Sequence, residues 1–156
     1  MSVLANKLVT PTAILGVGQE LRGDDAVGLE VARRLQRKLS GREDVLILLA
    51  GPAPENFTGA LRRFGPQRVI LVDAALMGES PGAACWLDWR VTARFSASTH
   101  SLPLSALAGY LEVELGCTVQ IIGVQPAGNE LGRPLSVQAK KGVRRAVSLI
   151  LGTLPN

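Results

Sequence analysis

Three side chains in this sequence have the types that a divalent metal site needs. Asp25 is the second of two adjacent aspartates after a glycine-bearing turn, Asp73 ends an apolar run, and His100 is the only histidine. Two carboxylates and one neutral imidazole form an oxygen, oxygen and nitrogen donor set for an ion such as zinc or nickel. Such a set leaves coordination positions open, where the metal could polarise a carbonyl or lower the pKa of a bound water.

Each of these positions also has a simpler interpretation. Asp24 and Asp25 lie where a helix is expected to begin, and an aspartate there can cap free backbone N–H groups. A cap needs only one carboxylate, so the local sequence leaves the role of the other open. Asp73 could likewise serve a cap or turn, and a lone histidine in a polar loop is usually a bystander. The spacing along the chain does not prove that the three side chains meet.

The elements that would position these residues follow a βα pattern. Near-continuous apolar runs predict strands at 12–17, 45–50, 68–72 and 118–124, with a candidate edge strand at 83–88. Apolar residues at helical spacing predict helices at about 25–39, 55–64, 103–115 and 134–154. This order predicts an α/β three-layer sandwich, in which a twisted, mostly parallel sheet of about five strands has helices on both faces. Ligands bind such sheets outside the carboxyl ends of the strands, where Asp25 and Asp73 are expected.

Length and composition limit the class of protein. The chain has 156 residues, of which 47% are hydrophobic and 19% charged, as in a single globular domain over residues 1–156. No apolar run reaches the roughly 18 residues of a membrane span, so we expect no membrane insertion. The first ten residues lack the apolar stretch of a secretory signal, which favours a cytoplasmic location. We also expect a monomer.

Several other functions are disfavoured by what the sequence lacks. The net charge is +4 but only 4% of the residues are aromatic, so we expect no nucleic-acid binding by stacking; a basic face that meets an acidic protein partner stays open. The pair Gly16 and Gly18 lacks the third glycine of a dinucleotide fingerprint, and we expect no organic cofactor. No zinc-protease helix and no serine-nucleophile elbow is present. Cys85 and Cys117 have no metal-type spacing and are expected to be reduced thiols.

Four motifs, in order along the chain, resemble those of the hydrogenase maturation endopeptidases, which trim the C-terminus of the large subunit of nickel–iron hydrogenases. Residues 16–28 resemble the family's Gly-x-Gly-Asn-x-Leu-x-x-Asp-(Asp/Glu)-Gly-x-Gly signature. Residues 72–74, 98–100 and 122–126 resemble its later motifs. Residues 53–56, 73–78 and 99–104 look most like the branch that serves formate-hydrogenlyase-type hydrogenases.

This resemblance implies specific roles for the candidate residues. The metal-binding carboxylate of the first motif corresponds to Asp25, which would leave Asp24 as the helix cap, and the other two ligands correspond to Asp73 and His100. The three would engage nickel already inserted in the large-subunit precursor, so nickel would be supplied by the substrate. Cleavage of the C-terminal extension would then be a metal-assisted check on nickel insertion. The glycines near the aspartates would give clearance for the incoming tail.

The sequence departs from the family pattern at two positions next to the site. Gln19 replaces the usual asparagine, and Ala26 stands where glycine is frequent, which would cause strain if that position requires a positive φ. Two other functions stay open at this point. One is a non-proteolytic metal-handling or assembly protein for the same precursor, and the other is an unrelated small-substrate hydrolase on the same scaffold.

Overall fold

A five-stranded sheet runs through the molecule, and a computed structural model describes it within residues 10–91 and 103–156. The spatial order is β2-β1-β3-β5-β4, with β1, β2, β3 and β5 parallel and β4 antiparallel at one edge. The sheet confirms the predicted mostly parallel arrangement, including its edge strand. The strands are β1 (Thr12–Val17), β2 (Val45–Gly51), β3 (Arg68–Ala74), β4 (Ala84–Leu87) and β5 (Thr118–Val124).

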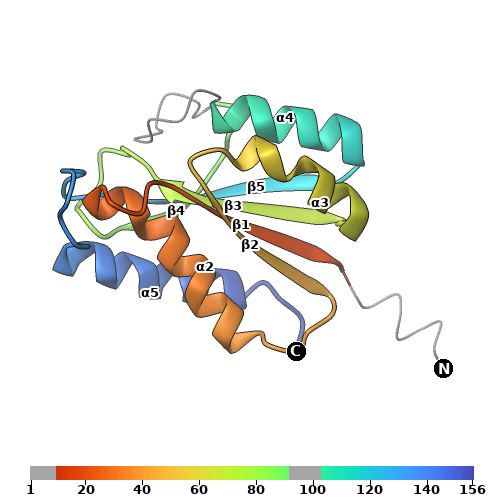
Figure 1. Cartoon of the computed structure of the whole chain (residues 1–156), viewed down its shortest axis with the longest axis horizontal. Coiled ribbons are helices and arrows are strands. Elements are labelled where there is room, and N and C mark those ends of the chain that lie inside the picture. The colour runs from red at the N-terminus through yellow and green to blue at the C-terminus, as the bar shows by residue number, and fades with distance from the viewer. Residues whose placement is uncertain (1–9, 92–102) are drawn as a thin grey trace.

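Two helices cover each face of the sheet, as the sequence predicts (Figure 1). Helices α2 (Val27–Lys38) and α5 (Val137–Leu151) lie on one face, and α3 (Thr58–Phe64) and α4 (Leu104–Leu115) lie on the other. Successive side chains of a strand point to opposite faces, so each strand contributes to both cores. In β1, Ile14 packs in the core with α2 and α5, whereas Leu15 packs in the core with α3 and α4.

The starts of three helices differ from the predicted ones. The helix expected from Asp25 begins with a 3-10 turn, η1 (Gly23–Ala26), and becomes α2 only at Val27. A second 3-10 turn, η2 (Pro54–Phe57), precedes α3 in the same way. The closing helix begins at Val137 rather than near residue 134, because the hydroxyl of Ser136 accepts a hydrogen bond from the backbone N–H of Ala139 and caps it.

Glycines bring α2 into direct contact with the backbone of the sheet. A Cβ at Gly28 would lie 2.3 Å from the carbonyl oxygens of both Val17 and Val72. A Cβ at Gly18, where φ is +142°, would lie 1.9 Å from the carbonyl oxygen of Asp25. The protein's own backbone fills this space, so the interpretation of these glycines as clearance for an incoming tail is wrong. Instead they hold Asp25 close to the end of β1.

Two expectations drawn from composition can be compared with the described residues. Cys85 and Cys117 are both free thiols, as predicted. Among the helices in residues 10–91 and 103–156, none combines the length and the apolar character that crossing a bilayer requires.

Candidate active site

Asp25 and Asp73 lie at the carboxyl ends of two neighbouring strands. Asp25 belongs to the η1 turn that follows β1, and Asp73 is the penultimate residue of β3, which pairs with β1. Both side chains are buried, with 1% and 2% of their surface exposed. The backbone N–H of Gln19 donates to Oδ2 of Asp25 at 3.0 Å, and that of Ala74 donates to Oδ1 of Asp73 at 2.8 Å. The parallel sheet therefore brings two of the three predicted ligands to one place.

Burial makes the ionised form of both carboxyl groups costly. It raises the pKa of Asp25, although the N–H of Gln19 and the guanidinium of Arg22 partly oppose this. Burial raises the pKa of Asp73 well above its usual value, and the negative charge of Asp25 raises it further. The two carboxylates are thus near enough to repel each other, and a bound cation would relieve that repulsion.

One oxygen of Asp25 is available as a ligand. Its Oδ1 is buried and accepts no hydrogen bond within the part of the chain that the structure describes. Asp25 also lines a cavity of about 210 Å³ between the segments that follow β3 and β5. A carboxylate oxygen without a donor, beside a cavity, suits a cation better than a structural hydrogen bond. The other lining residues are Ala74, Leu76, Pro126, Ala127, Gly128 and Asn129.

The third predicted ligand, His100, lies outside the described residues. Within residues 10–91 and 103–156, no group of three or more His, Cys, Asp or Glu side chains could hold a metal ion. The described part of the site is therefore a pair of carboxylates, and the ligand roles of Asp25, Asp73 and His100 stay predictions.

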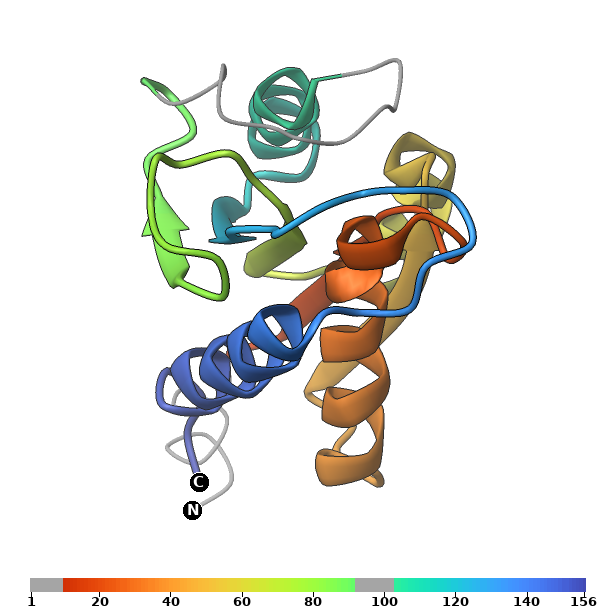
Figure 2. The ribbon, with the colours of Figure 1, turned by 90° about the vertical axis from the view of Figure 1, so that its left-hand side faces the viewer.

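Asp24 has a different role from the one predicted. Neither η1 nor α2 has a side-chain cap, so Asp24 is not the helix cap. Its carboxylate instead accepts hydrogen bonds from the backbone N–H groups of Ala127 at 2.8 Å and Ser136 at 2.7 Å, and from the Ser136 hydroxyl at 2.7 Å. Figure 2 shows the segment between β5 and α5 running across the turn at the start of α2. Asp24 therefore fixes Ala127, which lines the cavity together with Asp25. Its partners lie more than 100 residues away, so no local signal could have revealed them.

Gln125 lies next to the cavity-lining residue Pro126, and the sequence points to it only through the family resemblance. Its side-chain oxygen accepts a hydrogen bond from the backbone N–H of Met77 at 2.6 Å. Its backbone N–H donates to the carbonyl of Ala83 at 2.9 Å. Gln125 is buried, so these bonds fix the segment that leaves β3 just after Asp73.

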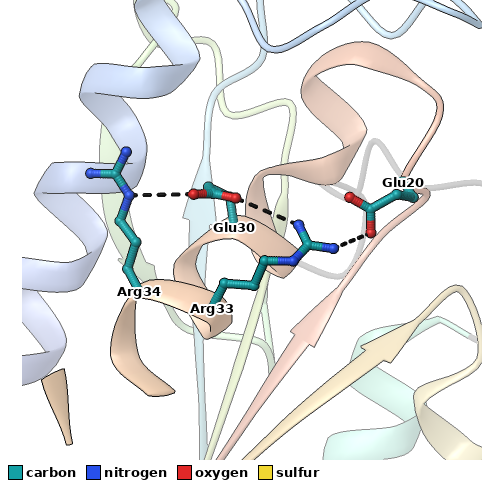
Figure 3. Close-up of polar contacts among 4 residues, drawn as sticks. All are labelled: Glu20, Glu30, Arg33 and Arg34. Atoms are coloured by element: carbon teal, nitrogen blue, oxygen red, sulfur yellow. Dashed lines mark hydrogen bonds and ion pairs between the residues drawn. The ribbon is translucent and has the colours of Figure 1, made fainter. Parts of the chain in front are cut away.

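Ion pairs between side chains join the loop after β1 to α2. Glu20 pairs with Arg33, which also pairs with Glu30 at 3.5 Å (Figure 3). These pairs lie beside the turn in which Gln19 meets Asp25.

The two departures from the family pattern do not disturb the site. Gln19 binds Asp25 through its backbone N–H, so this hydrogen bond does not depend on the side chain that replaces asparagine. Ala26 has φ −87° and ψ 1°, which any residue adopts, so the departure from glycine causes no strain there.

The comparison with protein families decides what kind of protein carries this site. The family model described as "HycI: Hydrogenase maturation protease" matches residues 29–153. The chain belongs to this family. It is therefore a protease, and the family resemblance seen in the sequence is confirmed. The matched range begins after Asp25, so the match does not assign a role to that residue.

Individual relatives agree with this family. The chain is 33% identical over 114 residues to the hydrogenase 3 maturation protease of Escherichia coli K12, covering 72% of this chain and 71% of that one. The crystal structure of the protease HycI from Thermococcus kodakarensis KOD1 matches with a TM-score of 0.83 and 35% identity, over 98% of this chain and 99% of that one. The solution structure of the endopeptidase HycI from Escherichia coli matches with a TM-score of 0.78 and 31% identity, over 90% and 89%. The similarity to HycI proteases is consistent with the formate-hydrogenlyase branch.

Proposed function

We propose that this protease removes the C-terminal extension of the large-subunit precursor of a nickel–iron hydrogenase, and that Asp25, Asp73 and His100 hold the nickel ion of that precursor. The observation that best supports the proposal is the buried Oδ1 of Asp25, which has no hydrogen-bond donor in the described residues and belongs to a cavity-lining side chain. The nickel ion is part of the substrate in this scheme. The cytoplasmic location and the monomeric state expected from the sequence are part of the same proposal.

The raised pKa values of the two aspartates support a site that is completed by its substrate. Without a cation, burial and mutual repulsion favour protonation of Asp73. Arrival of a divalent ion favours the ionised forms of Asp25 and Asp73, so binding releases protons. The ion supplies Lewis-acid polarisation of the scissile carbonyl or activation of an attacking water. The protein's own contribution is to keep both carboxylates in place, through the N–H groups of Gln19 and Ala74.

The cavity next to Asp25 suits an extended peptide. Its volume of about 210 Å³ admits part of an extended tail rather than a folded segment. Leu76 and Pro126 give it apolar walls, while Ala127, Gly128 and Asn129 contribute a stretch of loop. An unfolded C-terminal extension is the part of a precursor that could enter it.

The test uses purified nickel-loaded precursor, whose trimming is followed as a shift on a denaturing gel and by mass. We expect His100→Ala to abolish trimming while its circular dichroism spectrum and melting temperature match those of the wild type. Arg37→Ala, an exposed change on α2, is the control and should trim at the normal rate. Precursor without nickel should stay uncut with every variant.

Two results would contradict the proposal. Trimming by His100→Ala at the wild-type rate would remove the histidine from the site. Retained binding of the nickel-loaded precursor with unchanged mass, by the wild type, would show that this precursor is not cleaved and would contradict the proposed substrate.

A further inference from the structure

A groove lined by cations lies on the side of α5 that faces the edge strand β4. Its volume is about 740 Å³, larger than that of the cavity at Asp25. Cationic and polar side chains of α5 form most of its lining, with apolar side chains at Ala84 and Leu149. The α5 residues with polar or charged side chains are Lys141, Arg144, Arg145 and Ser148.

The charges along this groove are not balanced within the helix. In α2, Glu30 pairs with Arg33 and Arg34, each at 3.5 Å (Figure 3). In α5 the sequence has no acidic residue at all. Lys141 precedes Arg144 by three positions and Arg145 by four, and like charges at these spacings repel each other and weaken a helix. A cluster that costs helix stability is better explained by an external anionic partner than by packing.

Two of the groove's cations are available for binding. Within residues 10–91 and 103–156, neither Lys141 nor Arg144 forms an ion pair, and both are exposed. Arg145 is engaged differently, because its Nη1 donates to the carbonyl oxygen of Gly82 at 2.8 Å. This bond joins α5 to the turn that precedes β4 and so fixes the width of the groove.

The groove and the cavity share one structural segment. The backbone N–H of Gly82 donates to the carbonyl oxygen of Gln125 at 2.8 Å, and the side chain of Gln125 holds Met77 on the same segment. Leu76, at the start of that segment, lines the cavity with Asp25, and Ala84, just beyond its end, lines the groove. One segment of the chain, residues 76–84, thus connects the lining of the cavity to the lining of the groove.

We propose that this groove is a docking surface for an acidic, partly apolar peptide segment of the protein substrate. The inference rests on the proposed function for the identity of the partner, but not for the binding itself. Lys141 and Arg144 would contact carboxylates, and Leu149 and Ala84 would contact apolar side chains between them. Among the described residues that line the groove none is aromatic, so they offer no stacking surface of the kind that single-stranded nucleic acid uses.

The test is direct binding, measured by fluorescence anisotropy with a fluorescein-labelled peptide of alternating glutamate and leucine pairs. The same peptide with glutamine in place of glutamate is the uncharged probe. We expect the wild type to bind the acidic peptide, with an affinity that falls as salt rises, and to bind the uncharged peptide at least about tenfold more weakly. The double variant K141E/R144E should lose at least about tenfold in affinity. The control R37E/K38E makes the same change of net charge at two exposed cations of α2 and should bind like the wild type.

Different outcomes separate this inference from the proposed protease function. An equal loss in both double variants would mean that net charge alone attracts the peptide, and the docking surface would be wrong. A second outcome would also contradict the docking surface. In it, a single-stranded oligonucleotide or phosphatidylserine vesicles bind the wild type and lose binding in K141E/R144E, whereas the acidic peptide does not bind at all. Melting curves show whether K141E/R144E is folded, and K141A/R144A provides a milder version. Peptide binding needs no cleavage, so a failure of the protease assay would not affect the binding results. If the protease cleaves the precursor, K141E/R144E should raise KM for the precursor and leave kcat unchanged.

Discussion

Replacement of Asp24 by asparagine should destabilise the protein strongly, although the change conserves shape. The carboxylate of Asp24 is 2% exposed and accepts three short hydrogen bonds, from the N–H groups of Ala127 and Ser136 and from the Ser136 hydroxyl. Hydrogen bonds to a charged group contribute about 1.5–3 kcal/mol each, and they are not additive. The amide of asparagine places an NH2 group against at least one of these donors. The remaining donors then bind a neutral oxygen instead of a charged one. We therefore expect the free energy of unfolding to fall by about 2–4 kcal/mol.

The neighbouring aspartate provides the matched control. Asp25→Asn keeps the bond from the Gln19 N–H through its carbonyl oxygen but removes a charge that burial makes costly. Because burial raises the pKa of Asp25, its ionised form costs stability at neutral pH. The free energy of unfolding of Asp25→Asn should therefore equal that of the wild type, or exceed it by up to about 1 kcal/mol.

Urea unfolding followed by far-UV circular dichroism at pH 7 distinguishes the two variants. With a slope of about 2 kcal/mol per molar urea, Asp24→Asn should lower the midpoint by about 1–2 M, and Asp25→Asn should leave it in place or raise it. The reasoning would be refuted if the two substitutions cost the same stability, or if Asp24→Asn stayed within about 0.5 kcal/mol of the wild type.

Two further predictions concern titration and packing. The pKa of Asp73 is raised well above 3.8, so the folded protein holds a proton that the unfolded chain has released; wild-type stability should rise as pH falls through the raised pKa toward about 4. Urea titrations at several pH values should show a weaker rise for Asp73→Asn, and an unchanged profile would contradict the assignment. Gly28→Ala places a Cβ 2.3 Å from two carbonyl oxygens and should cost about 3 kcal/mol or more in thermal or urea unfolding. Gly59→Ala is the control, because its Cβ meets only the flexible end of Arg63, and it should leave stability unchanged or raise it. An equal loss of stability in the two alanine variants would show that close packing at Gly28 is not the cause.

The fold could be predicted from the sequence because its signals are local and repetitive. The apolar run around Ile14 and Leu15 predicts a strand buried on both faces, and the structure places these two residues in opposite cores. That Asp25 and Asp73 lie near each other could also be predicted. Each follows or ends a strand, and the parallel strands β1 and β3 have their carboxyl ends side by side.

What the sequence did not reveal depends on contacts between distant residues. The role of Asp24 is set by Ala127 and Ser136, which lie 103 and 112 positions away along the chain. The helix α2 begins two residues later than the sequence predicts, because the 3-10 turn η1 precedes it. Helix-capping preferences could not anticipate either result, because they consider only neighbours along the chain.

The hydrogen bonds of Asp24 also join distant parts of the chain. Asp24 and Ser136 are 112 positions apart, and the Ser136 hydroxyl that donates to Asp24 also caps α5. A chain without residues 127–136 would contain both aspartates but would lack the backbone N–H groups of Ala127 and Ser136 that bind Asp24. The surroundings of Asp25 therefore depend on contacts that only the later part of the chain, residues 127–136, provides.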